Sequence, residues 1–197
     1  MKKSSAFLVL TVLALGFSLM SFITPDEALP VDIKSSEIKW TGYHLAKSYE
    51  HWGYVNLKSG TVSTDGKKLT GGEFVIDMNS ISNKDIETEK DNTKLVGHLK
   101  SDDFFGVNEF PEAKLVIKGS ELKSGNIYTT TADLTIKGIT KEIQFDSEVK
   151  SISTSEVQAS ADLRIKRTDF NVMYGWSIEN AVLDGEFRLQ VSLIAKK

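Results

Sequence analysis

Apolar and polar residues alternate with a period of two over most of the chain from Val31 onward. Successive side chains of a β-strand point to opposite faces, so this period predicts half-buried strands. Eight such segments are expected, within 38–42, 53–57, 74–78, 113–117, 128–136, 143–149, 157–165 and 187–195. Turn sequences such as Asp65-Gly66 and Ser124-Gly125 separate neighbouring segments. The pattern predicts an all-β barrel or sandwich.

One charged stretch, from Ile81 to Leu99, breaks the alternation and predicts one short helix. The connector after it is expected to begin with Ser101 as the N-cap of a single turn and to end at Pro111, where the next strand starts. A surface loop is normally polar, but this connector carries three aromatic rings: Phe104, Phe105 and Phe110. These rings need an apolar surface to cover, so the connector is predicted to close an open end of the barrel as a plug or lid.

Three sequence blocks, one of them the connector itself, form an ordered set: LTGGEFVIDM at 69–78, GHLKSDDFF followed by FPEA within 97–113, and DLTIKGITK at 133–141. In order and spacing they resemble the YceI-like family, also called the polyisoprenoid-binding or extended lipocalin-like family. The similarity runs from about Val31 to the C-terminus. It implies an eight-stranded antiparallel lipocalin-like barrel, with a short helical connector or lid between its two halves. It also implies an elongated isoprenoid or fatty-chain ligand inside the barrel.

Inward parity and the family blocks together select twelve candidate cavity residues: Trp40, Phe74, Ile76, Phe104, Phe105, Leu115, Leu134, Ile136, Phe145, Leu163, Ile165 and Phe170. Several other inward positions are small, such as Gly42 and Ala161, and these either leave a tunnel or pack against larger neighbours. Periodicity alone favours a packed core, whereas the resemblance favours a cavity. Burial of each CH₂ group contributes ~0.8 kcal/mol, so a long chain can be held without any catalytic group.

The segment 167–172 also resembles a family motif and has two interpretations. In one it forms a polar mouth with Phe170 against the ligand. In the other it is an ordinary strand end, with Phe170 and Val172 packed beneath.

The chain has three histidines, His44, His51 and His98, and the most specific function that they could share is a zinc site. No pair has the close spacing of a metal motif, so no metal is expected. His51 is instead expected to cap the barrel rim or to hydrogen-bond a ligand head group. Catalysis is not expected either, because the chain has no Gly-x-Ser-x-Gly elbow, no phosphate-cradling glycine loop and no cysteine nucleophile.

The N-terminus combines Lys2 and Lys3 with an apolar run from Ala6 to Ile23, as in a secretory signal. The run also approaches the roughly 18–20 residues that span a bilayer. Residues 1–24 are therefore expected to be a signal peptide or an uncleaved anchor, followed by one barrel domain at 31–197. The absence of cysteine excludes a lipoprotein anchor and disulfides, which fits export to a Gram-negative periplasm.

The formal charge of −3 is spread over interspersed acids and bases without a basic run, so nucleic-acid binding is not expected. We expect an exported protein that binds a polyisoprenoid or similar apolar chain for transport or storage, without a cofactor. Transient membrane contact and a homodimer are further expectations. Two alternatives remain open: a structural or stress-response envelope module with a packed core and, less favoured, an enzyme acting on a lipid.

Overall fold

The computed structural model describes residues 27–45, 49–174 and 183–197. Strands dominate the described part, together with one α-helix and one short 3-10 helix. In chain order the elements are β1 (Glu27–Pro30), β2 (Glu37–His44), β3 (Glu50–Thr64), β4 (Leu69–Asn83), α1 (Glu89–Lys100), β5 (Glu112–Ser124), β6 (Ile127–Ile136), β7 (Ile139–Ile152), β8 (Glu156–Lys166), η2 (Arg167–Phe170) and β9 (Leu183–Lys196).

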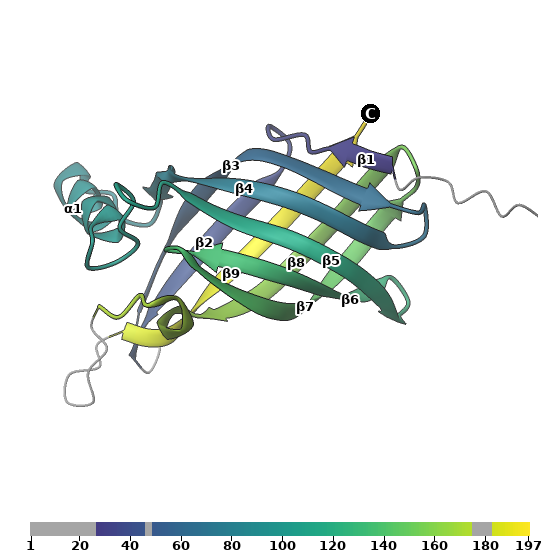
Figure 1. Ribbon diagram of the computed structural model, residues 1–197. Coiled ribbons are helices and arrows are strands. Elements are labelled where there is room, and N and C mark those ends of the chain that lie inside the picture. Colours follow the sequence, from purple (N-terminus) through teal and green to yellow (C-terminus); the bar gives the residue numbers. More distant parts are fainter. Residues whose placement is uncertain (1–26, 46–48, 175–182) are drawn as a thin grey trace, which may run out of the picture.

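Strands β2 to β9 close into an eight-stranded antiparallel barrel, because β4 returns to pair with β3 (Figure 1). The slot between β3 and β9 is filled in two pieces. β2 pairs with both strands in one half, whereas β1 pairs with β3 in the other half, where Leu29 faces Val62 and Val31 bridges Ala195. The short strand β1 therefore completes the wall beside β3, and the barrel still has eight strands.

The two ends of the barrel differ (Figure 1). We call the end with α1 and η2 the helix end, and the end with β1 and the C-terminus the far end. At the far end four inward side chains have no exposed surface and belong to one apolar core cluster: Leu29, Val62, Val157 and Ala195. None of the four lines the cavity described below, so we call the far end solid.

The eight predicted strands are confirmed, each lying within one of β2 to β9. The two predicted turns named above have the backbone that their glycines favour, with φ of 83° at Gly66 and 57° at Gly125. In the β6–β7 turn, Lys137 and Gly138 have φ of 50° and 73°. Two successive residues with positive φ give the two-residue hairpin turn that matches strand twist. The sequence missed β1, because four residues ending in a proline are too short to show alternation.

The short helix predicted within the stretch from Ile81 to Leu99 is confirmed as α1, although it begins only at Glu89, because β4 continues to Asn83 and Ile81 is a buried strand residue. The expectation for Ser101 is wrong. Ser101 ends α1 and does not cap a new turn: its hydroxyl donates to the carbonyl of His98 at 2.8 Å. That bond satisfies a carbonyl at the helix C-terminus. Over the described ranges, no helix is long and apolar enough to cross a bilayer.

Gly53 marks the closest approach of β3 and β4. A Cβ atom placed there would lie 1.8 Å from the carbonyl oxygen of Ser82, so the backbone itself would have to move. We expect Gly53→Ala to lower the free energy of unfolding by about 2–4 kcal/mol, measured by urea denaturation. The matched control is Gly97→Ala in α1, where a Cβ meets nothing within 4 Å and about 0.5–1 kcal/mol of stability is gained. Equal effects of the two substitutions would contradict this packing argument.

Candidate functional site

The barrel is hollow between its solid far end and its helix end. The cavity has a volume of about 760 Å³ and is lined by residues of all eight barrel strands. Typical ligand cavities occupy ~300–1,000 Å³, so this one is large enough for a sizeable ligand. Two inward hydroxyls, those of Thr130 and Ser147, are hydrogen-bonded to each other at 2.9 Å. Most of the other lining side chains are apolar, so the barrel encloses an apolar cavity and is not packed along its whole length.

Ten of the twelve candidate residues line this cavity: Trp40, Phe74, Ile76, Phe104, Phe105, Leu115, Leu134, Ile136, Phe145 and Leu163. Ile165 and Phe170 do not line it, so the prediction is wrong for these two residues. Both belong to the packed core, with exposures of 4 % and 2 %. Parity along β8 gives Ile165 its inward direction but not its depth, and η2 carries Phe170 into the core beside Val172. Of the two interpretations of the segment 167–172, Phe170 fits the one in which it packs beneath a strand end.

The connector after α1 lies over the helix end, and we call residues 101–107 the lid. Phe104 and Phe105 both line the cavity, with ring centroids 5.1 Å apart. The ammonium group of Lys137, in the β6–β7 turn, donates to the carbonyl oxygens of Asp102 and Phe104, each at 2.9 Å. Phe110 packs against the same turn, since a Cβ on Gly138 would lie 2.9 Å from its ring. The lid is therefore tied to the β6–β7 turn.

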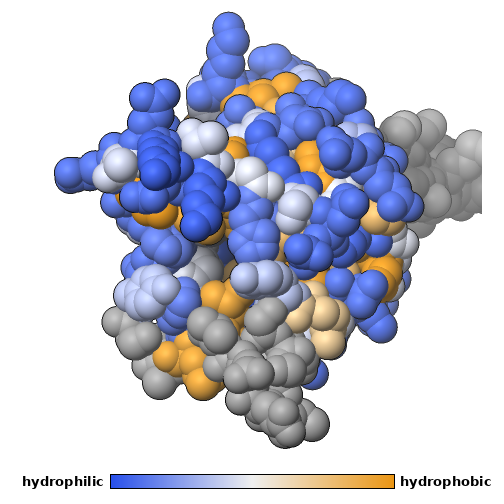
Figure 2. All heavy atoms as spheres, turned by 90° about the vertical axis from the view of Figure 1, so that its left-hand side faces the viewer, coloured by the Kyte–Doolittle hydropathy of each residue, from blue (hydrophilic) through white to orange (hydrophobic). Residues whose placement is uncertain are grey.

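An aromatic cluster joins the lid to the segment after η2. The rings of His98 and Tyr174 meet edge to face with centroids 4.1 Å apart, and His98 also lies 5.9 Å from Phe104. Phe105 in turn meets Phe187 of β9 at 6.3 Å. Such edge-to-face pairs stabilise by about 0.5–1.5 kcal/mol each beyond the area that they bury. Apolar residues stand out among mostly hydrophilic ones when this end is viewed directly (Figure 2).

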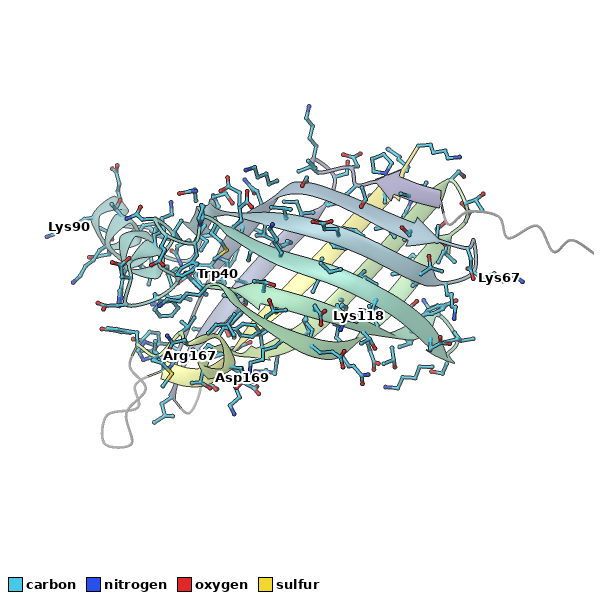
Figure 3. All side chains as sticks on the ribbon, viewed as in Figure 1. Trp40, Lys67, Lys90, Lys118, Arg167 and Asp169 are labelled. Carbon is cyan, nitrogen blue, oxygen red and sulfur yellow. The ribbon has the colours of Figure 1, made fainter. Side chains whose placement is uncertain are left out.

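Arg167 fixes the start of β9 relative to η2. Arg167 is only 3 % exposed, and its guanidinium donates to the carbonyls of Asp184 at 2.7 Å, Val172 at 2.7 Å and Tyr174 at 2.9 Å. Burial lowers the pKa of Arg167 from its ordinary value, and the nearby charge of Asp184 opposes this. Arg167 and Trp40 both lie toward the helix end of the barrel, opposite Lys67 (Figure 3). The arginine thus shapes the mouth of the cavity through backbone contacts.

A second polar group at the helix end is the pair His51–Asp85. Nδ1 of His51 lies 2.6 Å from a carboxylate oxygen of Asp85. The other carboxylate oxygen accepts from the amide of Trp52 at 2.7 Å and from the side chain of Asn83 at 2.5 Å. A carboxylate only accepts hydrogen bonds, so Nδ1 carries the proton, and in the neutral ring Nε2 is an acceptor. His51 also lines the cavity.

The carboxylate of Asp85 is held in its charged form. Burial raises the pKa of Asp85, but hydrogen bonds from His51, the Trp52 amide and Asn83 outweigh it, so the net pKa lies below the ordinary value. The folded-state pKa is therefore below the unfolded value of about 4. The stability that this group contributes is present above that unfolded value and is lost as the pH falls through the folded-state pKa.

We therefore expect Asp85→Asn to lower the free energy of unfolding at pH 7 by about 1–3 kcal/mol, because a charged acceptor of three hydrogen bonds is lost. The gap between wild type and variant should narrow as the pH falls from about 4 through the lower folded-state pKa of Asp85, because the unfolded chain binds the proton first. Urea denaturation from pH 3 to pH 7 measures both curves. A gap that stays constant over this range would contradict the linkage.

The three histidines do not form a metal site. His44 stacks on Tyr49 with ring centroids 3.6 Å apart, and burial, followed by the nearby His51, lowers its pKa. His98 belongs to the aromatic cluster across the mouth. Over residues 27–45, 49–174 and 183–197, no three His, Cys, Asp or Glu side chains gather closely enough to hold a metal ion.

Sequence reasoning missed Asp85, Lys137 and Tyr174. Asp85 lies in the stretch expected to be helical, although its position just after an alternating segment is typical of a strand end. Lys137 lies within one of the family blocks, but its bond to the lid joins residues 33 apart in sequence. Tyr174 follows the segment 167–172, which was considered for Phe170 and Val172, and no contact with His98 was predicted for it. In each case the functional contact spans a long sequence separation.

The comparison with known families decides the classification. A family model for the YceI-like domain matches residues 30–195. The chain belongs to the YceI-like family. It is 29 % identical over 181 residues to protein YceI of Escherichia coli O6:H1, which covers 87 % of this chain and 88 % of that protein.

Solved structures show the same fold. BcnA of Burkholderia cenocepacia superposes with a TM-score of 0.69 at 22 % identity, over 84 % of this chain and 99 % of BcnA. A polyisoprenoid binding domain from Saccharophagus degradans, implicated in plant cell wall breakdown, gives a TM-score of 0.65 at 19 % identity, over 87 % of this chain and 98 % of the domain. The closed eight-stranded barrel with one extra strand is thus the architecture of YceI-like proteins.

Proposed function

We propose that this protein binds a polyisoprenoid or a similar long apolar chain inside its barrel and carries or stores it in the cell envelope. The observation that carries the proposal is the cavity of about 760 Å³, with an apolar wall contributed by all eight barrel strands. The name of the Saccharophagus degradans domain, a polyisoprenoid binding domain of the same fold, supports this ligand class. The protein acts by binding in this proposal, not by catalysis.

The distribution of polar groups sets the orientation of the ligand. The far end is solid and apolar, whereas His51, Arg167 and Glu186 line the cavity at the helix end. A chain with one polar head group therefore places its tail toward the far end and its head near His51. Since Nε2 of a neutral His51 accepts a hydrogen bond, a head group with a hydroxyl donor suits this position.

The ligand class is tested by native mass spectrometry of the protein purified from the envelope of its own cells, followed by denaturation and identification of the released molecule. We expect a stoichiometric prenyl or fatty species. In titrations, each five-carbon unit added to a prenyl alcohol should tighten binding by about tenfold or more until the cavity is full. An unliganded mass that does not change on incubation with such lipids would overturn the proposal.

Export to the periplasm is the second part of the proposal, and it rests on Lys2, Lys3 and the apolar run from Ala6 to Ile23. These residues lie outside the described part of the chain. Cell fractionation and sequencing of the mature N-terminus test this part. A mature chain that begins near residue 25 in the periplasmic fraction is expected, and a cytoplasmic protein with an intact Met1 would contradict it.

Transient membrane contact fits the same picture, since a membrane is the natural source of such a chain. Four of the large apolar or aromatic side chains that are exposed lie around the helix end: Leu45, Tyr49, Met173 and Tyr174. Tyrosine is favoured where one face is apolar and the other wet. Cosedimentation with vesicles of the same cell's lipids measures this contact, and the homodimer remains a separate prediction.

A further inference from the structure

The hydrogen-bond ladder between β7 and β8 is formed over only half of its length. Pairing runs from Ile152 opposite Val157 to Ser147 opposite Ala161, and it stops there. Toward the helix end, residues 139–146 of β7 pair only with β6, and residues 162–166 of β8 pair only with β9. We call this unpaired part of the wall the seam.

The charges at the start of the seam explain why the ladder stops. One further step in the same register would place Asp146 directly opposite Asp162, and like charges directly opposite each other destabilise a strand pair. Each carboxylate is bonded on its own side of the seam. Asp146 accepts from Lys123 of β5 at 2.6 Å, and Asp162 accepts from Arg188 of β9. These hydrogen bonds lower the pKa of both carboxyls, which keeps both charged at neutral pH.

The next pair of outward side chains also turns away from the seam. Gln144 donates to the hydroxyl of Thr131 on β6 at 3.2 Å, whereas the guanidinium of Arg164 lies over the ring of Tyr43 on β2, at 5.2 Å. Within the described ranges, no side-chain hydrogen bond or ion pair joins residues 139–146 to residues 162–166. The two edges of the seam therefore separate without the loss of a ladder bond or an ion pair.

The cavity lies directly behind this seam. Ile143 and Phe145 on one edge, and Leu163 on the other, line its wall. On the outer surface, a depression of about 440 Å³ beside Asp146 and Asp162 shares three residues with the cavity: Ser160, Ala161 and Val191. The wall is therefore thin where the ladder ends, and small side chains form part of it.

We propose that the seam is a lateral portal, through which the apolar chain passes between β7 and β8 while the lid stays closed. This inference rests on the proposed function, because it assigns a route to the ligand of the same cavity. Between β5 and β6, between β6 and β7 or between β8 and β9, opening would break the backbone hydrogen bonds of a ladder that runs along the strands. At the seam the chain meets apolar side chains on both edges and no ladder to break.

A disulfide across the seam tests the portal. Gln144 and Arg164 stand opposite each other when the register is extended, and the chain has no cysteine of its own, so Gln144→Cys with Arg164→Cys gives one defined cross-link. The control joins Thr131→Cys with Gln144→Cys, which face each other across the complete β6–β7 ladder. The probe is a farnesyl chain that carries a fluorescent nitrobenzoxadiazole group, followed by stopped flow.

The oxidised seam variant should take up and release the probe at least about tenfold more slowly, with a Kd within about threefold of wild type, because locking a route changes rates more than affinity. Reduction should restore the rates, and the control cross-link should leave them unchanged. Unchanged rates with the seam locked would overturn the portal. If wild type does not bind the probe, the proposed function fails instead.

Amide hydrogen exchange of the ligand-free protein gives an independent readout. Those amides of residues 139–146 that point away from β6 should exchange at least about tenfold faster than the amides of 147–152 in the same strand. Equal protection along β7 would show that the seam is held closed by bonds like those of the rest of the wall, and the portal would be rejected.

Discussion

Replacing Ala159 by phenylalanine is expected to abolish binding of a long prenyl chain while leaving the ligand-free protein as stable as wild type. Ala159 faces inward from β8 and lines the cavity. A phenyl ring at this position occupies space that the ligand would otherwise fill, so the Kd should rise about 100-fold or more. The ring buries apolar surface without displacing a neighbour, so the unfolding temperature should stay within about 3 °C of wild type or increase.

The matched control for this substitution is Ala195→Phe at the solid far end. Ala195 has no exposed surface and does not line the cavity. Extra volume there overpacks the core, which should cost about 1–3 kcal/mol in the free energy of unfolding. Fluorescence titration and thermal denaturation of both variants give the two readouts. Equal destabilisation by both substitutions, with binding retained by Ala159→Phe, would show that the interior near Ala159 is not the ligand site.

Replacing Lys137 by asparagine is expected to weaken ligand binding about tenfold through the lid. The ammonium group of Lys137 donates two hydrogen bonds to lid carbonyls, at Asp102 and Phe104. Hydrogen bonds from charged groups contribute about 1.5–3 kcal/mol each when they are buried, and less at a partly exposed site. Asparagine tolerates the positive φ of this position, so the turn itself is retained. Without the bonds, Phe104 and Phe105 are no longer held over the cavity in advance, and the ligand must order them.

Titration calorimetry measures the affinity of this variant, and amide exchange of residues 101–107 measures the loosening of the lid. Lys141→Asn is the control. Lys141 lies on the same β6–β7 hairpin, is exposed, and makes no described side-chain hydrogen bond or ion pair. If the two variants bind equally well, or if lid exchange is the same in both, the lid does not contribute to affinity.

The wall of the barrel was largely predictable from the sequence. Alternation assigns a strand residue to one of two faces, and Leu134 and Ile136 were placed correctly inside because their neighbours are polar. The aromatic connector likewise indicated a cover, since a surface loop is normally polar and Phe104 and Phe105 need an apolar surface to contact. Alternation does not give depth along the barrel, and for this reason Ile165 was assigned to the cavity although it lies in the packed core.

The sequence by itself therefore determined the strands, most of the turns and the apolar character of the interior, because these depend on neighbours a few residues apart. Only the tertiary structure decided that the interior is hollow in the middle and solid at the far end. That outcome depends on how side chains from eight strands sum against the width of the barrel. It also paired His51 with Asp85 and set Asp146 and Asp162 at the start of the seam. Such juxtapositions depend on strand register and on the packing of elements that lie far apart in the chain, and alternation within one strand does not show which residues will face each other.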